Sequence, residues 1–279
     1  MRKLSNLFGV TILLVMILLS GCKKDKEDTT VDQLVMVKRA TGKMYTVNMT
    51  TGAMTEVMTL TYNDAPLTGL RGLVYDPATG KCFAGATNQG NGNFYSINLA
   101  TGAATLLNDN ANGDWDAIAD LVIAPDGNIL SLIYSNIEYN SALAVFNKVS
   151  GDDGTHKILI DGTSQDELWS PGALIYGSSE AQLIVGGESE IYFSNLEGVV
   201  SSYTSLVPTA NIDDSETFVM DMEKVGSTVY AMLYEYNDGN QYFVKLNTST
   251  GVITEIKLIA SGENSELYHC MALIPGDKL

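Results

Sequence analysis

Five short segments of this chain share one pattern at nearly equal intervals, and this repeat constrains the fold more than any other feature. In each segment a run of aromatic, β-branched and aliphatic residues leads to an asparagine, and a glycine follows three or four residues later. The asparagines lie 50, 49, 48 and 52 residues apart: Asn48, Asn98, Asn147, Asn195 and Asn247. A period of this length indicates similar units that bury their apolar surfaces against one another.

The residue types within the repeat have a direct structural meaning. Aromatic and β-branched residues favour strands. An asparagine side chain can accept hydrogen bonds from the backbone just after it, and glycine accepts the positive φ of a tight turn. We therefore predict that each segment is a strand followed by a hairpin turn, and we assign the five asparagines to the scaffold.

A second hairpin is expected between successive repeats. The first runs from Leu73–Asp76 through residues 77–80 into Cys82–Thr87. The others join Leu121–Ala124 to Ile129–Tyr134, Ala173–Tyr176 to Gln182–Val185, and Val219–Lys224 to Thr228–Tyr234. Each unit then has four short strands, and no stretch shows helical periodicity. Four-stranded units of about fifty residues arranged around an axis are the blades of a β-propeller.

The two ends of the repeat region predict how the ring closes. A lone strand, Gln33–Lys38, precedes the first repeat, and a lone strand, His269–Ile274, follows the last. Pairing them completes the first blade and hides both sheet edges. The expected fold is an all-β, five-bladed β-propeller over residues 33–279, closed by the C-terminal strand joining the N-terminal blade. Four or six blades remain possible if a terminal strand is misassigned.

Over residues 33–279 these repeats resemble the broad superfamily of kelch-like and quinoprotein-like propellers. A Trp-Asp pair occurs once, at residues 115–116, and does not recur from unit to unit as the signature of WD40 repeats does, and the chain lacks the tryptophan-docking motif of quinoproteins. The resemblance therefore implies the fold, and it implies no cofactor-dependent dehydrogenase activity.

The N-terminus has the features of a secretory leader. Arg2 and Lys3 precede an apolar run, Leu7–Leu19, which is too short for a membrane-spanning helix of about 20 residues. The run ends in Leu-Ser-Gly-Cys, which resembles the lipobox of bacterial lipoproteins. That resemblance implies a signal peptide over residues 1–21 and a lipidated (palmitate-bearing) first mature residue, Cys22.

Residues 22–32 are charged and contain almost no apolar side chain, so we expect a solvated tether. The stretch resembles the charged export signal of surface lipoproteins in Bacteroidetes-type bacteria. It implies an outer-membrane lipoprotein, lipid-anchored through Cys22, with surface exposure as one outcome.

The mature chain is strongly acidic. Without Arg2 and Lys3 it has 14 basic and 33 acidic residues, a net charge of −19. Binding to nucleic acid or anionic lipid needs clustered lysine and arginine, so nucleic-acid partners are excluded. Cys82 and Cys270 are expected to be two buried thiols, although an exported protein permits their pairing.

Candidate ligand-binding residues lie in the connections that lead into the innermost strands. Aligning those strands without gaps places five residues at one equivalent position: Thr68, Asp116, Leu168, Glu216 and Glu266. Both tryptophans and one histidine lie close by. We therefore predict an acidic, tryptophan-containing channel mouth formed by Trp115, Asp116, Trp169, Glu216, Glu266, Tyr268 and His269.

Three functions fit this arrangement. The first is a non-catalytic cell-surface binding protein for a glycan or a protein partner. The second is a glycoside hydrolase that uses Asp116, Glu216 or Glu266, since hydrolysis needs two carboxyl groups. The third is a structural module that binds Ca²⁺ through the oxygens of Asp213, Asp214, Glu216 and Glu266. No catalytic residue is assigned, Ca²⁺ is the only cofactor considered, and binding is favoured over catalysis.

Overall fold

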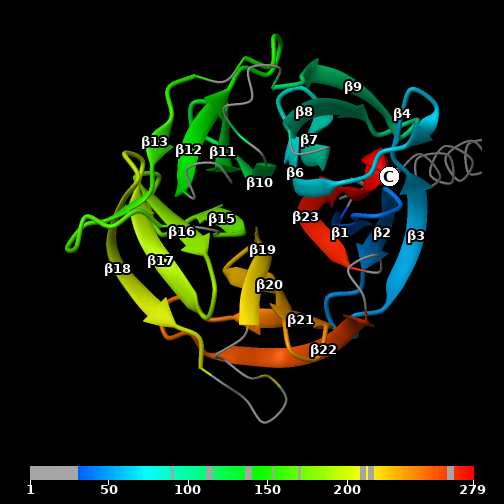
Figure 1. Cartoon of the computed structure of the whole chain (residues 1–279). Helices are drawn as coiled ribbons and strands as arrows, with labels where there is room; N and C mark the ends of the chain where they lie inside the picture. Colours follow the sequence, from blue (N-terminus) through cyan, green and yellow to red (C-terminus); the bar gives the residue numbers. More distant parts are fainter. Residues whose placement is uncertain are drawn as a thin grey trace, which may run out of the picture. The chain divides into compact units, whose positions relative to one another are not determined.

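The computed structural model shows a closed ring of five β-sheets, each of which extends outward from the central axis (Figure 1). The structure describes residues 31–88, 91–110, 115, 117–135, 140–152, 154–168, 171–207, 212, 217–262 and 267–279. The ring is formed by the unit Asp32–Leu279. Within the described residues, no helix is long and apolar enough to cross a bilayer.

The five blades are numbered along the chain, and the strands of each are given from the axis outward. Blade 1 contains β23 (Tyr268–Pro275), β1 (Asp32–Lys38), β2 (Lys43–Val47) and β3 (Met54–Thr59). Blade 2 contains β6 (Leu70–Asp76), β7 (Lys81–Asn88), β8 (Asn91–Asn98) and β9 (Ala103–Asn108). Blade 3 contains β10 (Ala117–Ile123), β11 (Ile129–Ser135), β12 (Asn140–Phe146) and β13 (Lys157–Ile158). Blade 4 contains β15 (Ala173–Tyr176), β16 (Gln182–Gly186), β17 (Glu190–Asn195) and β18 (Val199–Ser205). Blade 5 contains β19 (Thr217–Val225), β20 (Thr228–Glu235), β21 (Asn240–Leu246) and β22 (Ile253–Ser261).

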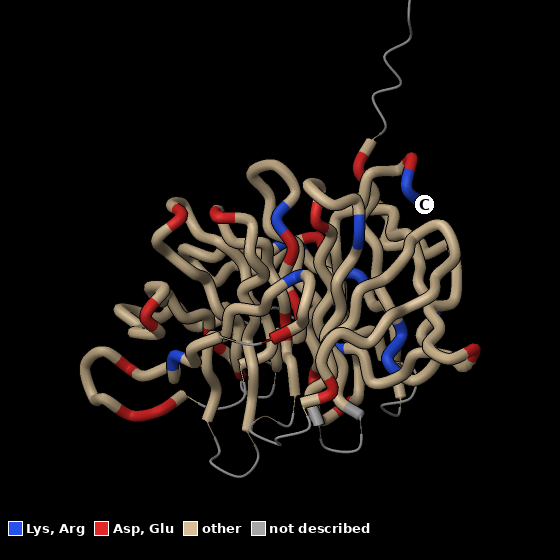
Figure 2. The backbone as a smooth tube through the Cα atoms, turned by 90° about the horizontal axis from the view of Figure 1, so that it is seen from above, with Lys and Arg blue, Asp and Glu red and all other residues tan. Residues whose placement is uncertain are grey.

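The ring closes as the sequence predicts. The C-terminal strand β23 pairs antiparallel with β1, from Asp32 opposite Pro275 to Lys38 opposite Tyr268. Seen edge-on, the start of β1 and the C-terminus lie on the same side of the ring (Figure 2). The strand that begins the propeller is therefore held by the strand that ends it.

Two blades are larger than predicted. Blade 2 gains β4 (Thr61–Tyr62) and β5 (Ala65–Pro66), and blade 4 gains β14 (Ile160–Asp161). These short strands belong to the connections that leave the preceding blades. β4 and β14 pair in parallel with the outer strand of the next blade, Thr61 with Ala103 and Ile160 with Val199, and β5 pairs antiparallel with β4. The four strands predicted for each blade are present, and the additional ones were not predicted, because a strand of two residues leaves no hydrophobic alternation in the sequence.

The five predicted turns are confirmed at the level of hydrogen bonds. The Oδ1 atom of each repeat asparagine accepts from backbone N–H groups two to four residues later, as Asn247 does from Ser249 and Thr250. The glycine that ends each turn has a φ between 70° and 81°. Each asparagine therefore closes its own turn.

These glycines also join neighbouring blades. The carbonyl oxygen of Gly102 accepts from Thr61 N, that of Gly198 from Ile160 N, and that of Gly251 from Val207 N. The donors lie just beyond the outer strand of the preceding blade. At Gly251 a Cβ atom would lie 1.9 Å from the carbonyl oxygen of Ser205, so no larger residue fits without a shift.

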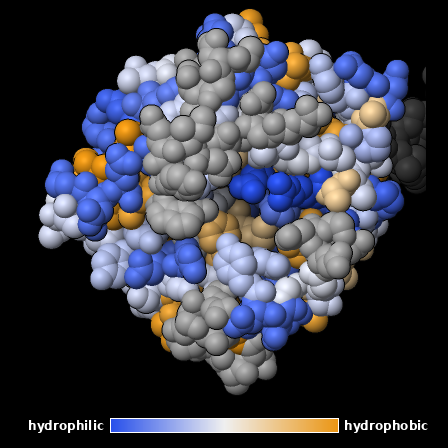
Figure 3. Space-filling view, viewed as in Figure 1, coloured by the Kyte–Doolittle hydropathy of each residue, from blue (hydrophilic) through white to orange (hydrophobic). Residues whose placement is uncertain are grey.

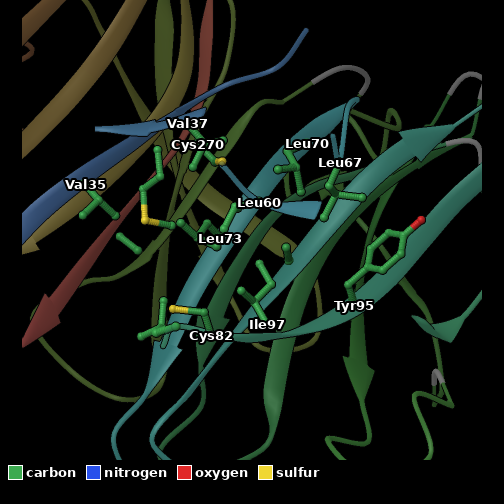
Figure 4. Packing of buried hydrophobic residues seen from close by; sticks show 14 of the residues in the cluster. Val35, Val37, Leu60, Leu67, Leu70, Leu73, Cys82, Tyr95, Ile97 and Cys270 are labelled. Carbon is green, nitrogen blue, oxygen red and sulfur yellow. The ribbon is translucent and has the colours of Figure 1, made fainter. Parts of the chain in front are cut away.

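The apolar core lies between adjacent blades. In the cluster between blades 1 and 2, the side chains of Val35, Leu70, Leu73, Cys82 and Cys270 are buried (Figure 4). Both cysteines are free thiols, as expected, and burial raises the pKa of each. Because each inner strand packs against the blades on both sides, its residues are buried on both faces of the sheet.

Candidate functional site

In four of the five blades, a β-bulge near the start of the inner strand turns one residue toward the axis. The register skips one inner-strand residue in blades 1, 2, 3 and 5. These skipped residues are His269, Arg71, Ala119 and Met220. Bulges re-aim side chains in this way and are common beside binding sites.

The equivalent residue of blade 4 follows from two matching hydrogen bonds. Leu174 N donates to Asp120 of blade 3, and Met271 N donates to Asp221 of blade 5. Leu174 is therefore equivalent to Met271, and Gly172 is equivalent to His269. Hence five equivalent positions face the axis, and they carry an arginine, an alanine, a glycine, a methionine and a histidine.

All five residues line a single axial pocket of about 280 Å³. The space-filling view shows a hollow at the centre of this face, where strongly hydrophilic surface lies beside apolar surface (Figure 3). The remaining described lining residues are Arg39, Tyr134, Pro171, Phe218, Tyr234, Tyr236 and Leu267. The pocket is near the small end of ligand sites, which span about 300–1,000 Å³.

Two arginines give this pocket a positive charge. The chain has three arginines in all, and the two outside the leader, Arg39 and Arg71, both line the pocket. The buried Nε atom of Arg71 has no hydrogen-bond partner among the described residues. Burial, and then the neighbouring charge of Arg39, lowers the pKa of Arg71 to about 10, so it remains a cation at neutral pH. This is a desolvated cation without a protein counter-ion in the described part of the chain.

His269 adds a polar group beside the arginines. Burial, followed by the charges of Arg39 and Arg71, holds the pKa of His269 well below its ordinary 6.5. The imidazole is therefore neutral at pH 7. Its Nε2 atom is buried and has no partner in the described part of the ring. A neutral imidazole can donate or accept one hydrogen bond at this atom, depending on its tautomer.

Aromatic side chains of blade 5 form one wall of the pocket. The Tyr236 ring lies 6.4 Å from that of Phe218 and 5.2 Å, edge-on, from that of Tyr234. Tyr236 is 52% exposed and forms the rim, while Phe218 lies against Gly172. A Cβ at Gly172 would lie 2.4 Å from the Phe218 ring, so glycine makes room for the ring.

Two carboxylates of the inner strands are fully buried and have backbone partners. Asp120 accepts from Leu121 N at 2.7 Å and from Leu174 N at 2.6 Å, and Asp221 accepts from Met271 N at 2.6 Å. Burial raises the pKa of both carboxyl groups, and their mutual repulsion adds to the rise for Asp221. They tie each blade to the inner strand of the next, so we assign them to the scaffold.

Trp115, a predicted ligand contact, lies between blades and is not among the lining residues of the axial pocket. It is 9% exposed and packs with Phe83, Phe94 and Phe146. Its Nε1 donates to His156 Nδ1 at 2.9 Å. This contact joins the start of blade 3 to its own outer strand.

Tyr268, another predicted contact, is also buried at an interface between blades. Its N–H donates to Gln241 Oε1 at 2.9 Å, and its ring meets the Tyr45 ring edge-on. It does not line the pocket. Of the three predicted contacts that the structure describes, only His269 does.

The other predicted residues, Asp116, Trp169, Glu216, Glu266 and Cys22, lie outside the described residues. The ungapped alignment behind the acidic ring nevertheless needs a correction. Thr68 lies three residues before Arg71, the axial residue of blade 2. The residue three before Met220, the axial residue of blade 5, is Thr217 and not Glu216. By the same count from Gly172, Leu168 is not the equivalent residue of blade 4. Blade 5 therefore contributes a threonine at this position. The described lining is cationic and aromatic, and the roles of the undescribed carboxylates and Trp169 remain predictions.

Sequence reasoning missed Arg39 and Arg71. A signal was present, because Arg71 is a charged residue near the start of a mostly apolar inner strand, next to Gly72. The rarity of arginine outside the leader was a second signal. Tyr134 and Tyr234 were missed because aromatic residues near strand ends usually serve packing.

Comparisons with known proteins identify the fold and no family. No protein-family model and no curated sequence matches this chain. Among solved structures, a chain of a nidogen/laminin complex is similar over 88% of this chain and 99% of its own, with a TM-score of 0.55 and 9% identity. A Bacteroides caccae protein of unknown function is similar with a TM-score of 0.52 and 11% identity, over 88% of this chain and 99% of its own. An exo-β-1,3-galactanase from Phanerochaete chrysosporium, solved with β-1,3-galactotriose, is similar with a TM-score of 0.53 and 11% identity, over 81% of this chain and 59% of its own.

Proposed function

We propose that this protein is an exported, lipid-anchored, non-catalytic binding protein that holds its ligand in the axial pocket. The observation that carries the proposal is the convergence of Arg39, Arg71 and His269 on one enclosed site. Buried polar groups in folded proteins normally have hydrogen-bond partners. The Nε atoms of Arg71 and Nε2 of His269 lack them in the described structure, and a bound ligand would supply them.

A terminal sugar of a glycan is the ligand that we favour. Aromatic faces pack against the C–H faces of a sugar ring, and N–H donors bind its oxygens. Phe218, Tyr234 and Tyr236 offer such faces beside the two arginines. A volume of about 280 Å³ suits one ring better than a chain of sugars.

The pocket and the first described strand residue, Asp32, lie at opposite ends of the ring. Asp32, where the chain enters the propeller, pairs with Pro275 at the far end of β23 from His269. The pocket therefore lies at the end of the axis opposite to Asp32. If Cys22 carries the lipid, the anchored segment continues into the ring at that opposite end.

Hydrolysis has less support than binding. The described lining residues of the pocket include no carboxylate, and a glycoside hydrolase needs two. Asp120 and Asp221 are buried and accept backbone hydrogen bonds. Asp116, Glu216 and Glu266 remain the residues that an enzyme would use. The described residues also contain no cluster of three metal-binding side chains, so Ca²⁺ binding has no support from them.

A glycan microarray tests the proposal. The mature domain, residues 29–279, is compared with the Tyr236→Ala and Trp169→Ala variants. We expect the wild type to bind a set of glycans with a common terminal sugar, and Tyr236→Ala to lose that binding while staying folded by circular dichroism. Trp169→Ala tests the predicted role of that tryptophan.

The same experiment can reject the proposal. Wild-type binding that Tyr236→Ala leaves intact would place the ligand elsewhere. Release of free sugar from a bound glycan, lost in Glu216→Gln or Glu266→Gln, would establish the hydrolase instead.

A further inference from the structure

We infer that the ligand of the axial pocket carries a carboxylate on a ring, as a terminal acidic sugar does, and that Arg71 and Arg39 bind this group. The inference rests on the proposed function, because it names the chemistry that the same pocket selects. It reverses the expectation from overall charge, since a chain of net charge −17 repels free anions at long range.

The placement of the cations is the first observation. Five lysines form ion pairs with carboxylates: Lys43, Lys148, Lys157, Lys245 and Lys278. Arg39 and Arg71 instead lie close enough to each other to repel, and both lie beside His269. Two adjacent, desolvated cations are unfavourable alone, and an anion between them relieves both costs.

The donor geometry is the second observation. An arginine guanidinium is planar and presents parallel N–H donors that match the two oxygens of a carboxylate. The unpartnered Nε of Arg71 belongs to one such edge. The His269 imidazole, in its Nε2–H tautomer, adds a third donor without a third charge. The site therefore offers directed donors for a flat anion.

The remaining lining determines what else the ligand contains. Phe218, Tyr234 and Tyr236 cover one side, and Leu267 and Pro171 add apolar surface. A bare inorganic anion would leave this surface unused. A ring that bears a carboxylate uses both the cations and the aromatic wall, which favours it over phosphate or sulfate.

Isothermal titration calorimetry on the mature domain tests this. The probes are D-glucuronate, D-galacturonate and N-acetylneuraminate, each beside its neutral methyl ester, with inorganic phosphate and sulfate as a separate arm. A charge-assisted hydrogen bond contributes about 1.5–3 kcal/mol, so we expect at least one acid to bind at least about tenfold more tightly than its ester. The inorganic ions should bind more weakly than that acid.

Variants assign the effect to the arginines. Arg71→Leu should weaken binding of the acid at least about tenfold. Arg71→Lys keeps the charge but loses the planar guanidinium, so its affinity for the acid should lie between those of the wild type and Arg71→Leu. Lys81→Leu is the matched control, because it removes one charge from an exposed side chain of another surface. Circular dichroism verifies folding, and Arg39→Gln replaces Arg71→Leu if the latter does not fold.

The outcomes separate this inference from the proposed function. Equal affinity for acid and ester, no binding of any acid, or undiminished binding by Arg71→Leu would overturn the inference that the ligand carries a carboxylate. Tighter binding of phosphate or sulfate would also overturn it and indicate a bare-anion site. If the microarray ligand still depends on Tyr236 in any of these cases, the binding function stands and only its chemistry is wrong.

Discussion

The outer turns and the axial positions of this propeller are both repeated five times, but they differ in how much their residues vary. At the turns, every blade has the same asparagine and the same positive-φ glycine. At the axial positions, the equivalent residues share only their orientation toward the axis: Arg71, Ala119, Gly172, Met220 and His269. Uniform positions build the ring, whereas positions that differ between blades make one end of the axis chemically specific.

The largest expected effect comes from a substitution at one of the repeated turn glycines. Gly251→Ala places a methyl group 1.9 Å from the Ser205 carbonyl oxygen at a φ of 70°. We expect a loss of about 3 kcal/mol in the free energy of unfolding, measured by urea denaturation. Gly80→Ala is the control, with a φ of 68° but no atom within 4 Å, and should lose only about 1 kcal/mol. Equal losses would show that blade contact adds nothing to the requirement for glycine.

A smaller effect is expected where the scaffold reaches the axis. Asp221→Ala leaves the buried N–H of Met271 without its acceptor, at the junction between blade 5 and the closing strand. The loss should be about 2 kcal/mol in the same denaturation experiment. Asp221→Asn keeps one acceptor oxygen and should lose less. An unchanged denaturation midpoint for Asp221→Ala would show that this carboxylate does not stabilise the closed ring.

At the variable axial positions, we expect a substitution that raises the free energy of unfolding. Arg71→Leu removes a largely buried cation that has no counter-ion among the described residues. Replacing such a charge with an apolar residue should raise the free energy of unfolding by about 1 kcal/mol in the absence of ligand. Thermal denaturation of wild type and variant at pH 7 measures this. A lower melting temperature would mean that Arg71 serves the scaffold.

The smallest predicted effect concerns pH. Burial raises the pKa of Glu223, at the opposite end of the axis, to about 7 from its ordinary 4.5. The native state therefore holds this proton more tightly than the unfolded chain. The resulting stabilisation is complete below about pH 4.5 and is lost as pH rises through 7.

Glu223→Gln should abolish that component. Melting temperatures at pH 5 and pH 8 should differ less in the variant than in the wild type. Comparing the two proteins cancels the contribution of His269, whereas the pKa values of Asp120 and Asp221, which the Glu223 charge helps to raise, should fall in the variant. Identical pH profiles would contradict a raised pKa.

The repeat predicted the ring, its five blades and its closure because turn chemistry is local. Asn48 and Gly52, for example, form their turn within five residues. The extra strands β4, β5 and β14 were not predictable, because they depend on contact with the next blade. The pocket was harder still. A one-residue shift in blade 5 placed Thr217 where the alignment put Glu216, and no local pattern marks a bulge.

Candidate site residues followed the same rule. His269 was found because it begins an inner strand, but Trp115 and Tyr268, chosen for the same reason, pack between blades. The two arginines were missed because their role depends on strands from different blades meeting at the axis. Sequence spacing thus predicted where a site could form, but not which side chains would reach it.

The pairing of β23 with β1 has a consequence for how the protein is made. The first strand of the ring to be synthesised waits for the last, because its inner neighbour is β23, the final strand of the propeller. Until then, β1 exposes an unpaired edge and blade 1 is incomplete. A chain that emerges N-terminus first, from a ribosome or through a membrane pore, cannot close its ring until Tyr268–Pro275 has arrived. Premature termination anywhere before Tyr268 would therefore leave every blade without a closed circle to pack in.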